Sequence, residues 1–114
     1  MNIELRNKVI ERILEHPEEL NMSRWIDHFG CCTTACFAGW TVIVGDGFQD
    51  ANRAFSEGTI GKRAVELLGI TAQEAKSLFN TNEWPRSIWE EYQIASQKEK
   101  AEIVAERARE IIHE

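Results

Sequence analysis

CCTTACFAGWTVIV, residues 31–44, is the stretch that decides the fold, and it contains no Lys, Arg, Asp or Glu. A helix that is apolar on all its sides lies buried inside a protein. The run is longer than the roughly four to eight residues of an ordinary strand, and this length favours a helix. We therefore predict a buried central helix over about residues 33–44, which ends near Gly45 and Gly47.

Helices are also expected on the N-terminal side of this stretch. Residues 2–16 carry apolar side chains at helical spacing. Pro17 ends this helix, because the residue before a proline avoids the helical conformation, and a short helical turn is expected to start at Pro17 itself. Ser23 is expected to cap a further short helix that contains Trp25 and Phe29.

The C-terminal side carries further helix starts. Two Ser/Thr-x-x-Glu capping boxes begin at Thr71 and Ser96. Further helices are expected to start at Thr59 and Ser87. Loops are expected over 46–58, with one turn around Ala51–Phe55, and over 80–85. The sequence contains no convincing strand pattern. The predicted fold class is therefore all-α, a compact bundle of five to seven short helices around the central helix, formed as a single domain over residues 1–114.

Composition and charge restrict the class of protein. The chain has 114 residues, of which 43% are apolar and 28% charged, as in an ordinary globular domain. Its net charge is −6, from 13 basic and 19 acidic residues, whereas proteins that bind duplex nucleic acid carry a basic patch for the phosphates. No apolar run reaches the roughly 20 residues that cross a bilayer, and the charged start is unlike a signal peptide. We expect a cytoplasmic protein that binds neither duplex nucleic acid nor membrane.

Three cysteines, Cys31, Cys32 and Cys36, lie within six residues and close to His28. A structural zinc site needs four Cys or His ligands, usually in two close pairs, and the second pair is missing, so we expect neither a metal nor another cofactor. On a shared helix, the β-carbons of Cys32 and Cys36 lie about 5–6 Å apart, too far for a disulfide. A Cys31–Cys36 bond requires the helix to begin after Cys31. Buried, reduced cysteines are the favoured interpretation.

The start of the central helix is the candidate ligand site. Thr33 and Thr34 add hydroxyl groups to the free backbone N–H groups of a helix N-terminus, where anions bind. The alternative is that these threonines only cap the helix. The chain has four tryptophans, whose rings either stack on a nucleobase or anchor the core, and we expect the Trp84-Pro85 loop to be exposed. The expected ligand-binding residues are Trp25, His28, Thr33, Thr34, Trp40 and Trp84, and no catalytic residue is assigned.

One pattern resembles that of a known family. The residues Cys31-x-Thr33-x-Ala35-Cys36-Phe37-Ala38-Gly39-Trp40 resemble the signature Cys-Gly-Thr-x-Ala-Cys-x-Ala-Gly-Trp/His of small, uncharacterised bacterial and bacteriophage proteins. The resemblance continues, in the same order, through Ala64-x-x-Leu67-Leu68-Gly69-Ile70, Leu78-Phe79 and Trp84-Pro85. It covers roughly residues 25–95, and Cys32 stands where the signature has glycine. The resemblance implies a shared fold and a prokaryotic or phage origin, and it assigns no catalytic residue.

The patterns favour a non-enzymatic helical protein that binds or sequesters a small anionic or nucleotide ligand. In a bacteriophage, such a protein would act in the host cytoplasm as a sponge for a nucleotide immune signal. One alternative is a protein-binding adaptor or inhibitor that uses the Trp84-Pro85 loop and acidic helix faces. Another is a thiol-dependent enzyme that pairs Cys31 or Cys36 with His28. The last helix carries Val104, Ala108 and Ile111 on one side and is a candidate seam for a homo-oligomer.

Overall fold

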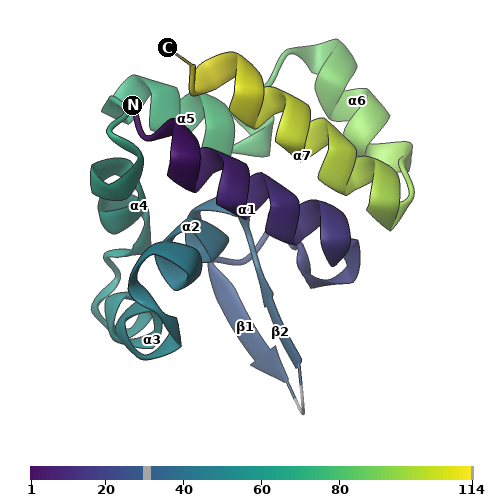
Figure 1. Cartoon of the computed structure of the whole chain (residues 1–114). Helices are drawn as coiled ribbons and strands as arrows, with labels where there is room; N and C mark the ends of the chain where they lie inside the picture. Colours follow the sequence, from purple (N-terminus) through teal and green to yellow (C-terminus); the bar gives the residue numbers. More distant parts are fainter. Residues whose placement is uncertain (30–31, 114) are drawn as a thin grey trace.

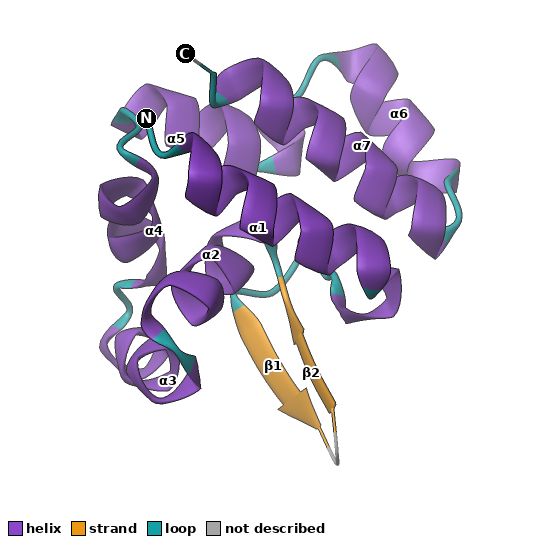
Figure 2. Ribbon diagram, viewed as in Figure 1, coloured by secondary structure: helices purple, strands orange, loops and turns teal. Residues whose placement is uncertain are grey.

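The structure, a computed structural model, describes residues 1–29 and 32–113, and for His28, Phe29 and Cys32 it describes the backbone alone. Helices make up most of the described chain, and two short strands form a hairpin (Figures 1 and 2). In chain order the elements are α1 (Ile3–Glu15), the 3₁₀ helix η1 (Pro17–Glu19), β1 (Ile26–Phe29), β2 (Cys32–Ala35), α2 (Phe37–Asp46), α3 (Phe48–Glu57), α4 (Ile60–Leu68), α5 (Ala72–Phe79), the 3₁₀ helix η2 (Thr81–Glu83), α6 (Arg86–Ile94) and α7 (Gln97–Ile111).

Most of the expected helices form where their end signals lie. The side chain of Asn2 caps α1 by accepting a hydrogen bond from the Leu5 N–H (3.0 Å), and α1 ends before Pro17. Reciprocal hydrogen bonds close both capping boxes, at Thr71 and Ser96, where α5 and α7 start. The predicted compact, helical fold class is confirmed, with one small hairpin added to it.

Helices α1 and α7 lie side by side and run in opposite directions, which brings the two termini to one end of the molecule (Figure 1). The Arg6 guanidinium donates to the Ile112 carbonyl across this pair (2.6 Å). Val104 and Ala108, expected on an oligomer seam, are fully buried in the core of the single chain. A homo-oligomer would therefore need another surface, and it stays a prediction.

The hairpin replaces two helical segments that the sequence analysis expected. Ile26 pairs with Ala35 and Asp27 with Thr34 in antiparallel register, so the predicted short helix after Ser23 is wrong, as is the helical conformation of residues 33–35. β-Branched residues such as Thr34 fit a strand better than a helix. Both strands project from the helical body (Figure 2), and Ile26 and Ala35 at their base are buried.

Helix α2 is the buried central helix, and it begins at Phe37 rather than near residue 33. Every residue from 37 to 43 is buried, as the absence of charge predicted. Gly39 is required at its position, because a β-carbon there would lie 1.9 Å from the carbonyl oxygen of Trp25. Because glycine has no side chain, the segment before β1 packs directly against α2.

Residues 48–57 form helix α3, so the loop predicted over 46–58 is wrong for most of its length. The two glycines that suggested a loop are the ends of this helix. Gly47 and Gly58 have φ values of 94° and 71°, conformations that favour glycine, and the N–H of Gly58 closes the last turn. Between them, Ala51 and Ala54 are buried, which gives α3 a narrow apolar face.

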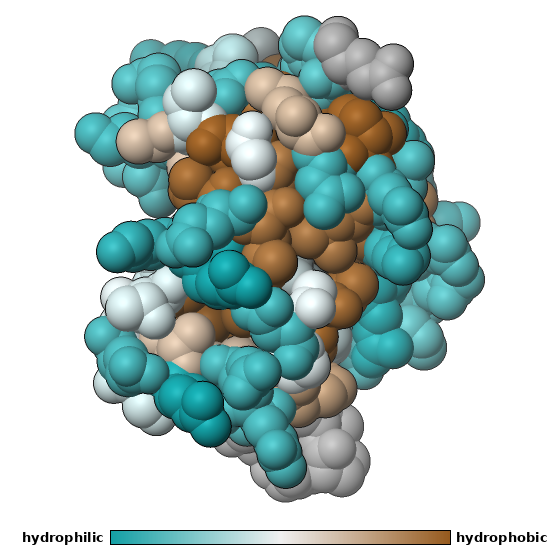
Figure 3. Space-filling view, turned by 60° about the vertical axis from the view of Figure 1, so that its left-hand side comes forward, coloured by the Kyte–Doolittle hydropathy of each residue, from teal (hydrophilic) through white to brown (hydrophobic). Residues whose placement is uncertain are grey.

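The surface is mixed in character. Figure 3 shows one face, on which apolar side chains form a band framed by hydrophilic ones. Among the large apolar side chains of the described residues, Ile94 is the most exposed, at 88%. No helix in the described part of the chain is both long enough and apolar enough to cross a bilayer.

Candidate functional site

The N-terminus of the central helix is closed and does not form the expected anion site. The N-cap residue of α2 is Cys36, whose sulfur accepts a hydrogen bond from the Gly39 N–H (3.4 Å). The Phe37 N–H donates to the Met22 sulfur (3.4 Å). Thr33 and Thr34 lie on β2, before the helix. The expected position of these threonines at the start of the helix is wrong, because the helix begins at Phe37 and the N–H groups of its first turn already have partners inside the protein.

Cys36 is a structural residue. Its thiol is free and buried, as expected for a reduced cysteine that packs as a small apolar group. Burial raises the pKa of this thiol to about 11, although nearby backbone N–H groups act in the opposite direction. A thiol protonated at neutral pH is a poor nucleophile, so the burial of this thiol argues against the alternative in which Cys36 acts as the nucleophile of an enzyme. Cys31 and the side chains of Cys32 and His28 lie outside the described part.

Trp40 and Trp84 anchor the core and are not accessible to a ligand. The Trp40 ring is 2% exposed, donates its indole N–H to the Glu19 carbonyl (2.9 Å) and carries the Arg12 guanidinium 4.9 Å above it. Trp84 is 5% exposed and donates to the Leu78 carbonyl (3.3 Å). The expectation that Trp84 is exposed is wrong, because its ring packs edge-on against Tyr92, with centroids 5.3 Å apart.

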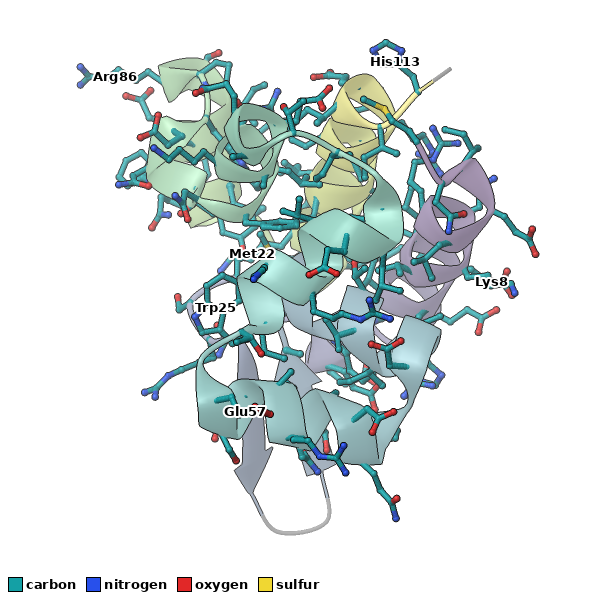
Figure 4. All side chains as sticks on the ribbon, turned by 90° about the vertical axis from the view of Figure 1, so that its left-hand side faces the viewer. Lys8, Met22, Trp25, Glu57, Arg86 and His113 are labelled. Atoms are coloured by element: carbon teal, nitrogen blue, oxygen red, sulfur yellow. The ribbon has the colours of Figure 1, made fainter. Side chains whose placement is uncertain are left out.

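Of the three tryptophans in the expected ligand set, Trp25 is the exposed one, with 44% of its surface accessible. It lies beside α4, near Met22 (Figure 4), and a β-carbon added to Gly61 would lie 3.1 Å from the ring. Together with Arg24 and Cys36, it lines a small pocket of about 190 Å³. The opposite wall of this pocket is formed by Phe79 and Asn80, at the end of α5.

The next pocket along this segment contains Thr34, and we call it the Thr34 pocket. It measures about 370 Å³, lies between the base of β2 and helices α6 and α7, and shares Ser23 with the Trp25 pocket. Of the six expected ligand residues, Trp25 and Thr34 thus lie in adjacent pockets, Trp40 and Trp84 lie in the core, and Thr33 pairs with His28 across the hairpin. The lining of the Thr34 pocket consists of Glu18, Leu20, Asn21, Ser23, Thr34, Tyr92, Gln93, Gln97 and Lys100.

Hydrogen bonds to backbone groups hold the wall of this pocket in place. The Gln97 side-chain amide donates to the carbonyls of Pro17 (2.8 Å) and Leu20 (2.7 Å), so α7 is tied to the segment that follows α1. Both of its N–H bonds are thereby used, and its carbonyl oxygen stays as an acceptor. The Asn21 side chain accepts from the Ser23 N–H (2.9 Å), and the Asn21 backbone N–H donates to the Ala35 carbonyl (2.9 Å). The sequence analysis assigned no role to these amides, because no local pattern marks them.

Two groups distinguish the Thr34 pocket chemically. Thr34 is 8% exposed, and its hydroxyl oxygen makes no hydrogen bond within the described part of the chain. Lys100 supplies the positive charge, with its ammonium 5.3 Å from the centre of the Tyr92 ring. Glu18 is the acidic group of the lining. The pocket therefore offers one cation, one carboxylate and several neutral donors and acceptors.

A larger groove of about 430 Å³ lies between α3 and α4, and several of its charged groups are already paired. Arg63 forms a two-pronged ion pair with Asp46 (2.6 and 2.9 Å) and a longer one with Glu66 (3.6 Å). The Arg63 hydrogen bond holds the pKa of Asp46 below its usual value. Arg53 approaches Asp50 at 3.8 Å. Because acidic groups outnumber basic ones in this lining, the groove is a poor site for an anion.

His16, Glu18 and Glu19 bring potential metal ligands within 4.8 Å of one another. Glu19 already binds the Arg12 guanidinium at 2.6 Å. A metal ion would have to compete with this positive charge for the carboxylate. This cluster is therefore better explained as an ion pair that fixes η1 against α1.

Comparisons with models of protein families, with curated proteins and with solved structures find no match to this chain.

Proposed function

We propose that this protein is a non-enzymatic binding protein that holds a small ligand with an anionic group, such as a nucleotide, in the Thr34 pocket. The observation that carries the proposal is the buried, unpartnered hydroxyl of Thr34 in the wall of a polar pocket that also contains Lys100. The proposal moves the expected anionic ligand from the start of the central helix to the neighbouring strand.

The Thr34 hydroxyl supports the proposal because buried polar groups in proteins almost always have a partner. Leaving a hydroxyl without one costs about 1–3 kcal/mol. A ligand that supplies a donor or acceptor at this point would remove that cost. Because that oxygen is itself buried, the ligand would reach it through a shift of the surrounding lining.

Lys100 and Glu18 support a ligand that carries both an anionic group and hydroxyl or amine groups. The ammonium of Lys100 attracts a phosphate or carboxylate, and its position over Tyr92 restricts its motion. Glu18 is more than half exposed and accepts hydrogen bonds, as a ribose hydroxyl or an exocyclic amine would require. A volume of about 370 Å³ lies within the usual range for small-molecule sites.

The lining is suited to holding a ligand rather than transforming it. Its polar side chains in the described part are amides, hydroxyls, one ammonium and one carboxylate, and none of them forms a paired nucleophile and base. A narrower role follows if the chain comes from a bacteriophage, where such a protein would sequester a nucleotide signal of host immunity.

Calorimetric titration of the purified protein with AMP, 3′,5′-cyclic AMP, ADP-ribose and adenosine tests the proposal. We expect at least one phosphate-bearing ligand to bind with a Kd below about 1 mM. Lys100→Met keeps the length of the side chain and removes its charge, and it should weaken that binding about tenfold or more, because a desolvated charge pair is lost. Its effect on adenosine should be small.

Lys8→Met is the matched control. Lys8 is exposed on α1, lies away from the pocket lining and forms one exposed ion pair, with Glu4 (3.5 Å). It should leave affinity unchanged. The proposal fails if none of the four compounds binds, or if Lys8→Met and Lys100→Met weaken binding equally.

A further inference from the structure

Helices α6 and α7 form a second groove with faces that the Thr34 pocket does not use. This groove measures about 360 Å³. Its lining combines acidic and apolar side chains, and we call it the acidic groove. Its main lining residues are Glu91, Ile94, Glu99, Glu102, Ile103 and Glu106.

The carboxylates of the acidic groove are largely unneutralised. No Lys or Arg belongs to its described lining. Glu106 has a long, exposed contact with Arg109 (3.8 Å). The Glu99 carboxylate accepts the Ser96 backbone N–H (3.0 Å), and this hydrogen bond holds the pKa of Glu99 below its usual value. Glu102 and Glu106 lie four residues apart on α7, where like charges repel each other.

An exposed apolar side chain lies among these charges. Ile94, the last residue of α6, is 88% exposed, and Ile103 of α7 is partly buried against the core. Isoleucine at this exposure leaves nearly all of its apolar surface in water. An apolar centre within a polar rim is the usual anatomy of a protein–protein interface.

We propose that the acidic groove docks a basic, amphipathic helix of a partner protein. Charge complementarity selects a basic partner, because four carboxylates face the groove in a chain of net charge −6. The groove runs between two helices joined by a short turn, so the side-chain ridges of a third helix can pack into it. An apolar residue of that helix would cover Ile94, while lysines or arginines one turn away on either side would meet Glu91, Glu102 and Glu106.

This inference is independent of the proposed ligand site. The Thr34 pocket uses Tyr92 and Gln93 of α6 and Gln97 and Lys100 of α7. None of these residues lines the acidic groove. A variant of one site therefore leaves the lining of the other intact, and the two proposals can fail separately.

The test uses a fluorescent, 18-residue lysine/leucine peptide with amphipathic helical spacing as the probe. A glutamate/leucine peptide of the same pattern, and a lysine/leucine peptide with two central prolines, are the controls. Fluorescence anisotropy measures the Kd for each. We expect the basic helix to bind at least tenfold more tightly than either control, with an affinity that falls as salt is added.

Two variants locate the binding surface. Ile94→Ser removes the exposed anchor, and Glu102→Gln with Glu106→Gln removes two charges; each should weaken binding about fivefold or more. Glu11→Gln with Glu15→Gln changes the net charge equally on the exposed side of α1 and should have less than a twofold effect. Because all of these side chains are exposed, the variants should unfold at the temperature of the original protein.

Three outcomes would overturn the proposal: no binding of the basic helix, equal binding of the proline-containing peptide, or an equal loss in the α1 control variant. The last outcome would indicate attraction to the net charge alone. A variant that melts early is replaced by Ile94→Thr or by Glu106→Gln alone, and the same criteria apply.

Discussion

The two halves of the stretch over residues 31–44 do different things, although they are adjacent in the sequence. Residues 36–44 form a structural unit that packs in or against the core, and in it Cys36 caps the helix and Trp40 anchors the core. Thr34, two residues earlier, leaves a hydroxyl unpaired in the wall of a pocket. A compact motif in a sequence therefore need not be a functional unit, because most of its residues can be selected by packing.

The largest expected effect is on the structural half. Gly39→Ala should lower the free energy of unfolding by about 3 kcal/mol, because its β-carbon would collide with the backbone oxygen of Trp25 and neither backbone can move cheaply. Urea unfolding followed by circular dichroism measures the change.

Gly61→Ala is the control for this substitution. Its β-carbon would meet only the rim of the Trp25 ring, at 3.1 Å, and helix propensity favours alanine. We expect a change below about 1 kcal/mol. Equal costs at the two glycines would show that the close contact between Trp25 and α2 is not what requires Gly39.

The next effect concerns the Cys36 thiol and pH. Its pKa is about 11 in the folded protein and 9.0 ordinarily, so only the unfolded chain ionises the thiol between these values. The contribution to stability is complete below about pH 9 and is lost as the pH rises toward 11, by about 2–3 kcal/mol. The unfolding free energy measured from pH 8 to 11 should therefore fall.

Cys36→Ser removes this ionisation while keeping a good N-cap residue. Above pH 9, the serine variant should therefore gain stability relative to the original protein. If the difference stays constant over that range, Cys36 is less buried than its surroundings indicate.

The smallest expected change is an increase in the free energy of unfolding, and it concerns the other half of the stretch. Thr34→Val should raise the free energy of unfolding by about 1 kcal/mol, because it removes an unpaired buried hydroxyl from a strand that accommodates valine well. The same variant should weaken the binding of any phosphate ligand that the original protein binds. Thermal unfolding and calorimetry measure the two effects.

Thr41→Val is the matched control, because the Thr41 hydroxyl donates to the Phe37 carbonyl at 2.8 Å and is fully buried. Losing that bond should lower stability by about 1 kcal/mol. If both variants change stability in the same direction, the missing hydrogen bond of Thr34 is not what distinguishes the two threonines.

The errors of the sequence analysis have two physical causes. The hairpin depends on pairing between Ile26 and Ala35 and on hydrogen bonds from Asn21 and Cys36 to distant carbonyls. Such contacts have no periodic trace in a charge-free run, where the length of the run favours a helix. Helix α3 was missed because its two glycines are its ends, and glycine is also a loop signal.

The candidate sites were only partly within reach of the sequence. Thr34 was selected for its hydroxyl, and it does line a pocket, but the helix N-terminus expected beside it lies two residues further on and is closed. Trp84 was expected to be exposed because its loop is polar, yet Tyr92 covers it. Lys100 and Ile94 were not singled out, because one lysine or one isoleucine in a helix carries no local signal.

The sequence by itself determined the helical class, the capped starts of α1, α5 and α7, and the burial of residues 37–43, because capping and hydrophobic patterning act between residues close together in the chain. Only the tertiary structure decided which side chains are covered and which groups meet in a pocket. Those outcomes depend on the packing of residues far apart in the chain, such as Thr34 and the α6–α7 pair, which line one pocket. The stretch that opened the sequence analysis is therefore mainly a packing motif, with Thr34 at its edge in the wall of a pocket.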